Sequence, residues 1–330
     1  MKIIVTGGAG FIGSHLVEKL VNQGHDVIVL DNFSTGNIEN ISFLKNKIQI
    51  ITCDLSEQKS WIKLFSKVDI VFHLAALADI VPSIENPSAY FKSNVTATLN
   101  ILESSIRYNV KKIVYSASSS CYGIPKEYPT SEKAIINPQY PYALTKYLGE
   151  QLVLHWNKVY NLQTVSLRLF NVYGTRSRTS GTYGAVFGVF LKQKIANKPL
   201  TVVGDGNQLR DFIYVSDIVD AFISAANIKI NGEILNIGSG KTHSINKIVK
   251  LLNSKSINIP KRPGEPDRTW ANITKAKKIL DWEPKISLEE GIAKMIENID
   301  YWNNAPLWDE KSIEKATKSW FKYLGHQSEK

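Results

Sequence analysis

A tyrosine and a lysine four residues apart, Tyr142 and Lys146, are the side chains of this sequence best suited to proton transfer. On a helix, this spacing places a phenol and an ammonium group one turn apart on the same face. A phenol has a pKa of about 10, so it is a weak base at neutral pH. Because a neighbouring cation stabilises the phenolate, we expect Lys146 to lower the pKa of Tyr142, which could then remove a proton from a hydroxyl group.

A run of small hydroxyl residues precedes this pair. It contains Ser116, Ser118, Ser119 and Ser120 and follows an apolar strand. One of these hydroxyls could share the substrate oxygen with Tyr142, while the others form a turn. The sequence predicts a phenol and a serine acting on one oxygen atom.

Three glycines near the N-terminus, Gly7, Gly10 and Gly13, lie between an apolar strand and an amphipathic helix. In this setting the first glycine allows a tight turn, the second a close approach to pyrophosphate, and the third close packing of helix on strand. The start of the helix adds free N–H groups and a positive dipole end. The pattern predicts a dinucleotide site.

An acid at the end of the next strand, Asp31, stands 18 residues after Gly13. At that place a carboxylate accepts hydrogen bonds from ribose hydroxyls and repels a 2′-phosphate, so NAD is favoured over NADP. Asp54 and Leu55, after the third strand, are placed to approach adenine. Together with Tyr142, these residues indicate hydride transfer at a hydroxyl or carbonyl carbon.

Short strands alternate with long helices over the first half of the chain. The predicted strands are Lys2–Thr6, Asp26–Leu30, Ile48–Cys53, Ile70–His73, Lys112–Ser116 and Thr164–Leu169, and the helices include Phe11–Gln23, Ser88–Tyr108 and Tyr142–Tyr160. This alternation predicts an α/β fold with a Rossmann-type doubly wound parallel sheet. We expect residues 1–172 to form the NAD-binding domain, with later segments returning to it. Residues 173–330 should form a smaller mixed α/β substrate lobe.

The last predicted element is a helix over Asp309–Leu324. Asp309 is a good N-cap, and apolar residues recur at helical spacing: Ile313, Ala316, Trp320 and Leu324. We expect this helix to pack against the body of the protein.

Composition excludes several classes of protein. The chain is 43% hydrophobic and has no apolar run of 18 residues, so no membrane-spanning helix is expected. The formal charge is +10, and the lysines and arginines are spread along the chain with acidic residues among them. No basic run with interleaved aromatic residues, typical of nucleic-acid binding, is present. Cys53 and Cys121 give neither a disulfide framework nor metal spacing, so we expect no metal and a reduced, cytoplasmic location.

With these residues in hand, the chain resembles the extended short-chain dehydrogenases/reductases that act on nucleotide sugars, and most of all the UDP-glucose/UDP-galactose 4-epimerase branch. The resemblance runs from residue 1 to about 300. The matching motifs are the glycine run 7–13, His73-Leu-Ala-Ala76, Asn94, Ser118 with Tyr122-Gly123, Tyr142 with Lys146, Arg168-Leu-Phe-Asn171, the run 210–215 and Arg262-Pro-Gly-Glu265.

The resemblance implies a role for each matching residue. The catalytic residues would be Ser118, Tyr142 and Lys146. The residues implied at NAD are Gly7, Gly10, Phe11, Ile12, Gly13, Asp31, Asn32, Asp54, Leu55, Leu74, Ala75, Ala76, Asn94, Ser116, Tyr142 and Lys146. Those implied at the nucleotide sugar are Ser118, Asn171, Arg210, Arg262, Glu265 and Thr269, with the two arginines clamping the diphosphate.

Two positions depart from related enzymes. The 4,6-dehydratases and decarboxylases of the family carry a carboxylate after the catalytic hydroxyl, where this chain has Ser119 and Ser120, so dehydration is not expected. Thr269 stands where a bulky aromatic residue would restrict the sugar pocket to plain hexoses. The small residue implies room for an N-acetyl group at C2.

The resemblance therefore implies an NAD-dependent 4-epimerase of a UDP-hexose, with UDP-N-acetylglucosamine or UDP-glucose as substrate and a role in polysaccharide synthesis. The alternatives are a C4 dehydrogenase or reductase, a UDP-glucuronate 4-epimerase, and an NAD-binding protein without activity. The family also implies a homodimer formed through the helices Ser88–Tyr108 and Tyr142–Tyr160. Five apolar residues could serve that interface or the core: Leu99, Leu102, Ile106, Leu148 and Leu152.

Overall fold

A seven-stranded parallel sheet forms the centre of the protein in the computed structural model, which describes residues 1–178 and 186–325. Its strands are β1 (Lys2–Thr6), β2 (Asp26–Asp31), β3 (Ile48–Thr52), β4 (Ile70–His73), β5 (Lys112–Ser118), β6 (Gln163–Leu169) and β11 (Glu233–Ile237). The order across the sheet is β11-β6-β5-β4-β1-β2-β3, and neighbouring strands are parallel. This is the predicted doubly wound Rossmann arrangement, with order reversing beside β1.

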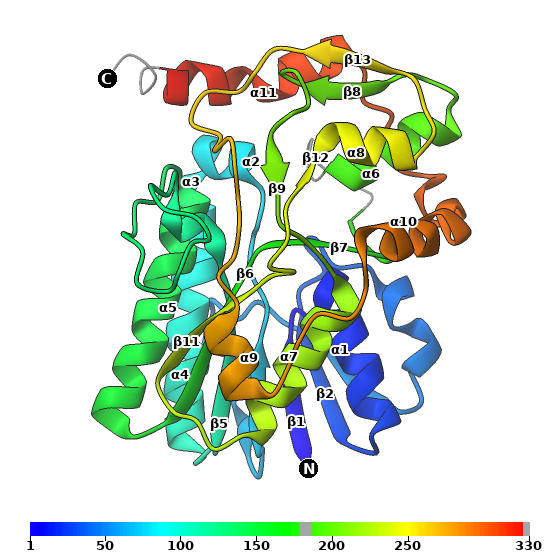
Figure 1. The fold of residues 1–330 in the computed structure, drawn as a ribbon. Coiled ribbons are helices and arrows are strands. Elements are labelled where there is room, and N and C mark those ends of the chain that lie inside the picture. The colour runs from blue at the N-terminus through cyan, green and yellow to red at the C-terminus, as the bar shows by residue number, and fades with distance from the viewer. Residues whose placement is uncertain (179–185, 326–330) are drawn as a thin grey trace.

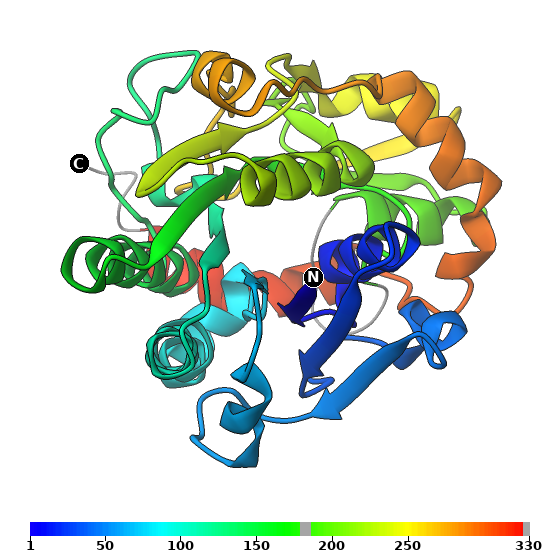
Figure 2. The ribbon, with the colours of Figure 1, turned by 90° about the horizontal axis from the view of Figure 1, so that it is seen from below.

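Helices cover both faces of the sheet. Figure 2 shows α1 (Phe11–Asn22) and α7 (Val215–Asn227) on one side, and α4 (Ala97–Arg107) and α5 (Pro141–Tyr160) on the other. The residues of β1 alternate between these two layers: Ile3 and Val5 join the core under α1 and α7, and Ile4 joins the core under α4 and α5. A strand covered on both faces buries nearly all of its side chains, which explains its continuous apolar sequence.

A smaller lobe lies over the carboxyl ends of the strands (Figure 1). Its elements are β7 (Asn171–Tyr173), α6 (Val186–Ile195), β8 (Leu200–Val203), β9 (Leu209–Arg210), β10 (Phe212–Tyr214), β12 (His243–Ser244), α8 (Ile245–Leu251), β13 (Ser256–Ile259) and α10 (Leu288–Glu297). They share a separate apolar core that includes Phe190, Ile248 and Trp302. The chain crosses between lobes several times, since β11 and α9 (Thr274–Leu280) return to the sheet.

The predicted helix Ser88–Tyr108 is interrupted. It consists of α3 (Pro87–Phe91), one π-helical turn at Lys92–Thr96, and α4. Such π turns insert an extra residue where a side chain must be redirected. Here the turn contains Asn94, whose side chain bonds to a neighbouring loop, so a long-range contact interrupts the regular helix.

The predicted C-terminal helix is present as α11 (Glu310–Leu324), and Asp309 caps it through the backbone N–H of Ser312. It lies across α2 (Ile80–Glu85) at the top of Figure 1. Trp320 and Leu324 pack against Val81 of α2. Thr317, not the predicted Ala316, completes the buried face.

Among residues 1–178 and 186–325, no helix combines the length and apolar character needed to cross a membrane. Within the same ranges, His, Cys, Asp and Glu side chains form no group of three suited to a metal ion. Both cysteines are free, and burial raises the pKa of the Cys53 thiol to about 11.

Candidate active site

A cleft of about 720 Å³ opens between the two lobes, at the carboxyl ends of the sheet strands. With the exception of Asn94, every residue predicted for catalysis, cofactor or substrate lines it. From residues 1–172 these are Gly7, Gly10, Phe11, Ile12, Gly13, Asp31, Asn32, Asp54, Leu55, Leu74, Ala75, Ala76, Ser116, Ser118, Tyr142, Lys146 and Asn171. From the remainder of the chain they are Arg210, Arg262, Glu265 and Thr269.

The glycine turn after β1 leaves no room for side chains. Gly7 has a φ of +67°, and a Cβ atom there would lie 2.8 Å from the backbone of Ala75. A Cβ at Gly13 would lie 2.1 Å from the Gly7 carbonyl oxygen. Gly10 is the N-cap of α1 and brings no side-chain acceptor, so the first N–H groups of the helix are directed to the cleft. These groups suit a phosphate.

Asp31 closes the other side of this turn. Its carboxylate accepts hydrogen bonds from the backbone N–H of Ala9 at 2.9 Å and of Phe33 at 2.8 Å. Burial raises the pKa of Asp31, and these backbone bonds act in the opposite direction. Gly36, which the sequence analysis missed, also lines the cleft, and a Cβ there would lie 3.1 Å from both carboxylate oxygens. A glycine five residues after the strand-end acid Asp31 is the sequence signal that could have predicted this contact.

A dinucleotide fits these residues. The glycine turn and the start of α1 suit its pyrophosphate, and a buried carboxylate with remaining lone pairs suits ribose hydroxyls.

Asn94 corrects the prediction of a cofactor contact, because it lies outside the cleft lining and is 1% exposed. Its amide binds both the N–H and the carbonyl of Leu77, at 2.8 and 3.0 Å. The same amide donates to Thr145 Oγ1 on α5 at 3.0 Å. Because its hydrogen-bonding groups are used within the protein, Asn94 fixes the loop after β4 against the helix that carries Tyr142.

His73 supports the same loop from below. The Thr98 hydroxyl donates to the Asn94 carbonyl, so it accepts from Nε2–H of His73, at 2.9 Å. Nδ1 then accepts from Thr6 Oγ1 at 2.7 Å, and Thr6 Oγ1 accepts from the N–H groups of Leu74 and Ala75. Burial lowers the pKa of His73 to about 3. The imidazole is therefore neutral and holds the backbone against Gly7.

Tyr142 and the serines after β5 meet in the cleft. Ser118 Oγ lies 2.8 Å from Ser120 Oγ, and hydrogen bonds to these two hydroxyls lower the pKa of Tyr142. Burial has the largest effect and raises that pKa, and the charge of Asp79 adds to the rise. The pKa of Tyr142 is therefore raised, contrary to the lowering expected from Lys146, because removal from water outweighs the hydrogen bonds.

Lys146 lies over the ring of Tyr115, with Nζ 4.5 Å from the ring centroid. Burial lowers the pKa of Lys146 to about 7, while the charge of Glu150, one turn further along α5, raises it. Glu150 itself forms a buried, two-pronged pair with Arg168 on β6, at 3.0 and 2.5 Å. This pair anchors the helix to the sheet and places a negative charge near the lysine.

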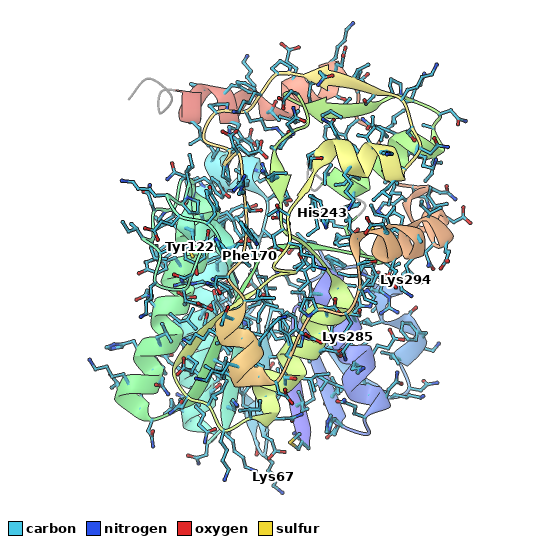
Figure 3. All side chains as sticks on the ribbon, viewed as in Figure 1. Lys67, Tyr122, Phe170, His243, Lys285 and Lys294 are labelled. Carbon is cyan, nitrogen blue, oxygen red and sulfur yellow. The ribbon has the colours of Figure 1, made fainter. Side chains whose placement is uncertain are left out.

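An aromatic frame around Tyr142 was missed by the sequence analysis. The Tyr140 ring is stacked on it at 6.3 Å with an interplanar angle of 8°, and Tyr90 meets it edge-on at 6.5 Å. Phe170 also lines the cleft, and Tyr122, labelled beside it in Figure 3, packs on it with ring centroids 6.4 Å apart. Tyr90 belongs to α3, about 50 residues away in sequence, so no spacing rule connects it with Tyr142.

An ion pair between Arg178 and Asp79 was also missed. Both residues line the cleft, and the Arg178 guanidinium binds the Asp79 carboxylate. The backbone N–H of Asp79 donates to the Tyr90 hydroxyl oxygen at 3.1 Å, and Tyr90 meets Tyr142 edge-on, so the pair lies close to Tyr142. The two charges neutralise each other at this end of the cleft.

The residues predicted to bind the substrate line the same cleft. Thr269 donates to the Asn171 side-chain oxygen at 2.7 Å, which leaves the NH₂ group of Asn171 to donate elsewhere. Arg210 pairs with Glu265 at 2.9 Å. The Arg262 guanidinium lies 5.3 Å from the ring centroid of Trp320. Two guanidinium groups and an amide therefore converge on the cleft, an arrangement suited to a diphosphate.

Comparisons with known proteins agree with this geometry. Residues 3–238 match the model of the NAD dependent epimerase/dehydratase family. A protein of Methanocaldococcus jannaschii named putative UDP-glucose 4-epimerase is 40% identical over 302 residues, covering 89% of this chain and 97% of that protein.

Two solved structures share the fold closely. UDP-N-acetylglucosamine 4-epimerase from Methanobrevibacter ruminantium, in complex with UDP-N-acetylmuramic acid, is 32% identical with a TM-score of 0.84, covering 90% of this chain and 98% of that one. UDP-glucuronic acid 4-epimerase from Bacillus cereus, in complex with UDP-glucuronic acid and NAD, is 34% identical with a TM-score of 0.85, covering 91% and 99%. This chain belongs to the NAD-dependent epimerase/dehydratase family and is an NAD-dependent nucleotide-sugar epimerase.

Proposed function

We propose that this protein inverts C4 of a UDP-linked hexose, with UDP-N-acetylglucosamine and UDP-glucose as its substrates. One observation carries the proposal: Tyr142 and Ser118 meet in a cleft that also contains the glycine turn and the Asn171–Arg210–Arg262 group. The cleft thus offers a proton acceptor, a dinucleotide cradle and diphosphate ligands in one place.

In the proposed mechanism, Tyr142 removes the proton from O4 while Ser118 donates a hydrogen bond to that oxygen. NAD held by the glycine turn and Asp31 would supply the hydride acceptor for C4 and the hydride donor for its return. Tyr142 returns its proton to O4 when the hydride comes back to the other face of the sugar. Arg210, Arg262 and Asn171 hold the diphosphate while the sugar turns about it. Because burial raises the pKa of Tyr142, the phenolate needs a stabilising positive charge during the reaction, which protonated Lys146 and the nicotinamide of NAD would supply.

The serines after β5 argue for epimerisation over dehydration. Ser119 and Ser120 line the cleft where dehydratases of the family carry carboxylates. An aliphatic hydroxyl is a far weaker base than a carboxylate at neutral pH, so neither serine could remove a C5 proton. With Tyr142 and Ser118 as the acting groups, oxidation and reduction at C4 is the simplest reaction.

The size of the sugar pocket supports a substrate with a C2 N-acetyl group. Thr269 lines the cleft, whereas the bulky Trp270 is held away by a 2.9 Å hydrogen bond from its indole N–H to the Gly240 carbonyl. The paired charges of Arg178 and Asp79 favour a neutral sugar over a uronate, since the guanidinium is already neutralised. UDP-glucuronate is therefore the second candidate substrate.

The test is incubation of the purified protein with UDP-N-acetylglucosamine, UDP-glucose and UDP-glucuronate in separate reactions. Products are followed by NMR and free NADH by absorbance. We expect the 4-epimer of the first two without free NADH. Stoichiometric NADH with a keto product would instead indicate the C4 dehydrogenase. Absence of any epimer would contradict the proposal.

We also propose that the protein is a cytoplasmic homodimer that pairs through α4 and α5. Leu102 cannot contribute to such an interface, because it is fully buried in the core. Leu144 of α5 and Phe91 of α3 are about half exposed, so they offer apolar surface for such an interface. Sedimentation equilibrium tests this, and Leu144→Glu should shift the protein to a monomer.

A further inference from the structure

Trp320 reaches the cleft from the far end of the chain. It belongs to α11, is 4% exposed, and lines the cleft together with residues of both lobes. Its indole N–H donates to the Pro263 carbonyl at 2.7 Å. Pro263 directly follows Arg262, so this bond fixes the backbone of the segment that carries the arginine.

The indole ring also contacts the arginine itself. The Arg262 guanidinium lies over the ring, 5.3 Å from its centroid, within the range of a cation–π interaction. The same ring meets Tyr140 at 6.5 Å, and Tyr140 stacks on Tyr142. A chain of ring contacts thus connects the predicted diphosphate ligand with the predicted catalytic base.

The tryptophan is held in place by the docking of α11 on α2. Leu324 and Trp320 form an apolar cluster with Val81, and Ile80 and Val81 themselves line the cleft. Ser319 Oγ donates to the Glu85 carboxylate at 2.8 Å. The helix is thereby fixed on both sides of Trp320, so the ring presents a defined surface to the guanidinium.

We propose that Trp320 is a positioning residue that holds Arg262 toward the diphosphate of the substrate, so that α11 completes the substrate site. The inference rests on the proposed function, in which Arg262 binds that diphosphate. An exposed arginine side chain has many rotamers. If it is fixed before binding, less conformational entropy is lost when the ligand binds.

The test compares Trp320→Leu and Trp320→Phe with the wild type. Calorimetric titration with UDP, dTDP and GDP identifies the diphosphate that binds most tightly. We expect Trp320→Leu to weaken its binding about 10-fold and to raise KM by the same factor, with kcat within about twofold, as lost cation–π stabilisation implies. Trp320→Phe retains an aromatic face and should restore most of the affinity. Binding of the corresponding monophosphate should change less.

Leu324→Ala is the matched control, because Leu324 belongs to the same apolar cluster but not to the cleft. It should lower the melting temperature as Trp320→Leu does, yet leave diphosphate affinity unchanged. Equal losses of affinity in both variants, or none in Trp320→Leu, would overturn the inference. So would a wild type that binds none of the diphosphates. If the wild type binds a diphosphate tightly but epimerises none of the sugars, the proposed function is wrong. The affinities of the Trp320 variants for that diphosphate then still decide the role of Trp320.

Discussion

Thr269 Oγ1 donates a hydrogen bond of 2.7 Å to the side-chain oxygen of Asn171, two residues that are 98 positions apart in sequence. The contact joins the residue predicted to set the size of the sugar pocket to the one predicted at the phosphates. Thr269 also receives the backbone N–H of Asp211, so its position is fixed from both sides. Thr269 therefore has two roles: its small size leaves room in the sugar pocket, and its hydroxyl orients Asn171. Different substitutions at this position can test the two roles separately.

Thr269→Tyr should reduce kcat/KM for UDP-N-acetylglucosamine at least 10-fold relative to UDP-glucose, because an aromatic ring would occupy the space proposed for the N-acetyl group. Thr269→Val keeps the size and removes the hydroxyl. Because Asn171 would lose the hydrogen bond from Thr269, this variant should bind both substrates about threefold or more weakly, to the same extent for each. Steady-state kinetics with both sugars measures the ratio, and an unchanged ratio in Thr269→Tyr would place the N-acetyl group elsewhere.

Tyr142→Phe should lower kcat by about 10² to 10⁴, the usual contribution of a positioned base. The ring remains, so stacking on Tyr140 and the fold should be retained. NAD content after purification should match the wild type. Tyr147→Phe, on the same helix but outside the cleft lining, is the control and should keep nearly full activity. Turnover near the wild-type rate in Tyr142→Phe would refute the proposed mechanism.

Asp79→Asn should improve kcat/KM for UDP-glucuronate relative to UDP-glucose by about 10-fold, because it frees the Arg178 guanidinium to pair with a substrate carboxylate. It also removes a negative charge that raises the pKa of Tyr142, so the optimum for activity should move to lower pH. Asp69→Asn, whose carboxylate pairs with Lys111 at the opposite end of the sheet, is the control. No change in the substrate ratio would argue against Arg178 as a carboxylate ligand.

His73 should make the protein less stable as pH falls. Its pKa is about 3 in the folded protein and 6.5 when exposed, so between these values only the unfolded chain binds the proton. Stability from this group is therefore complete above pH 6.5 and is lost toward pH 3. The expected loss between pH 7 and pH 5 is about 2 kcal/mol.

Urea unfolding of the wild type and of His73→Asn at both pH values measures this contribution. The variant is expected to be less stable at pH 7, because it loses the bonds to Thr6 and Thr98. Its additional loss on acidification should be smaller than that of the wild type by about 2 kcal/mol. Parallel pH dependence in the two proteins would mean that His73 is not neutral in the folded state.

Much of the fold could be read from the sequence, because its signals are local. The strands β1 to β6 and the helices α1, α5 and α11 coincide with the predicted ranges within a few residues. Apolar runs, amphipathic spacing and caps such as Asp309 act over one or two turns. The interrupted helix 88–108 shows the limit of this reasoning, since its π turn contains Asn94, which contacts the distant residues Leu77 and Thr145.

The sequence by itself determined the chemistry that the cleft can perform: a glycine turn for a dinucleotide, an acid for ribose, and Tyr142 with Lys146 and Ser118 for proton transfer. Only the tertiary structure decided how these groups are tuned. It buried Tyr142 and so raised its pKa, paired Arg178 with Asp79, and brought Trp320 from the last helix under Arg262. Such effects depend on desolvation and on contacts between distant segments, which residue spacing alone does not encode.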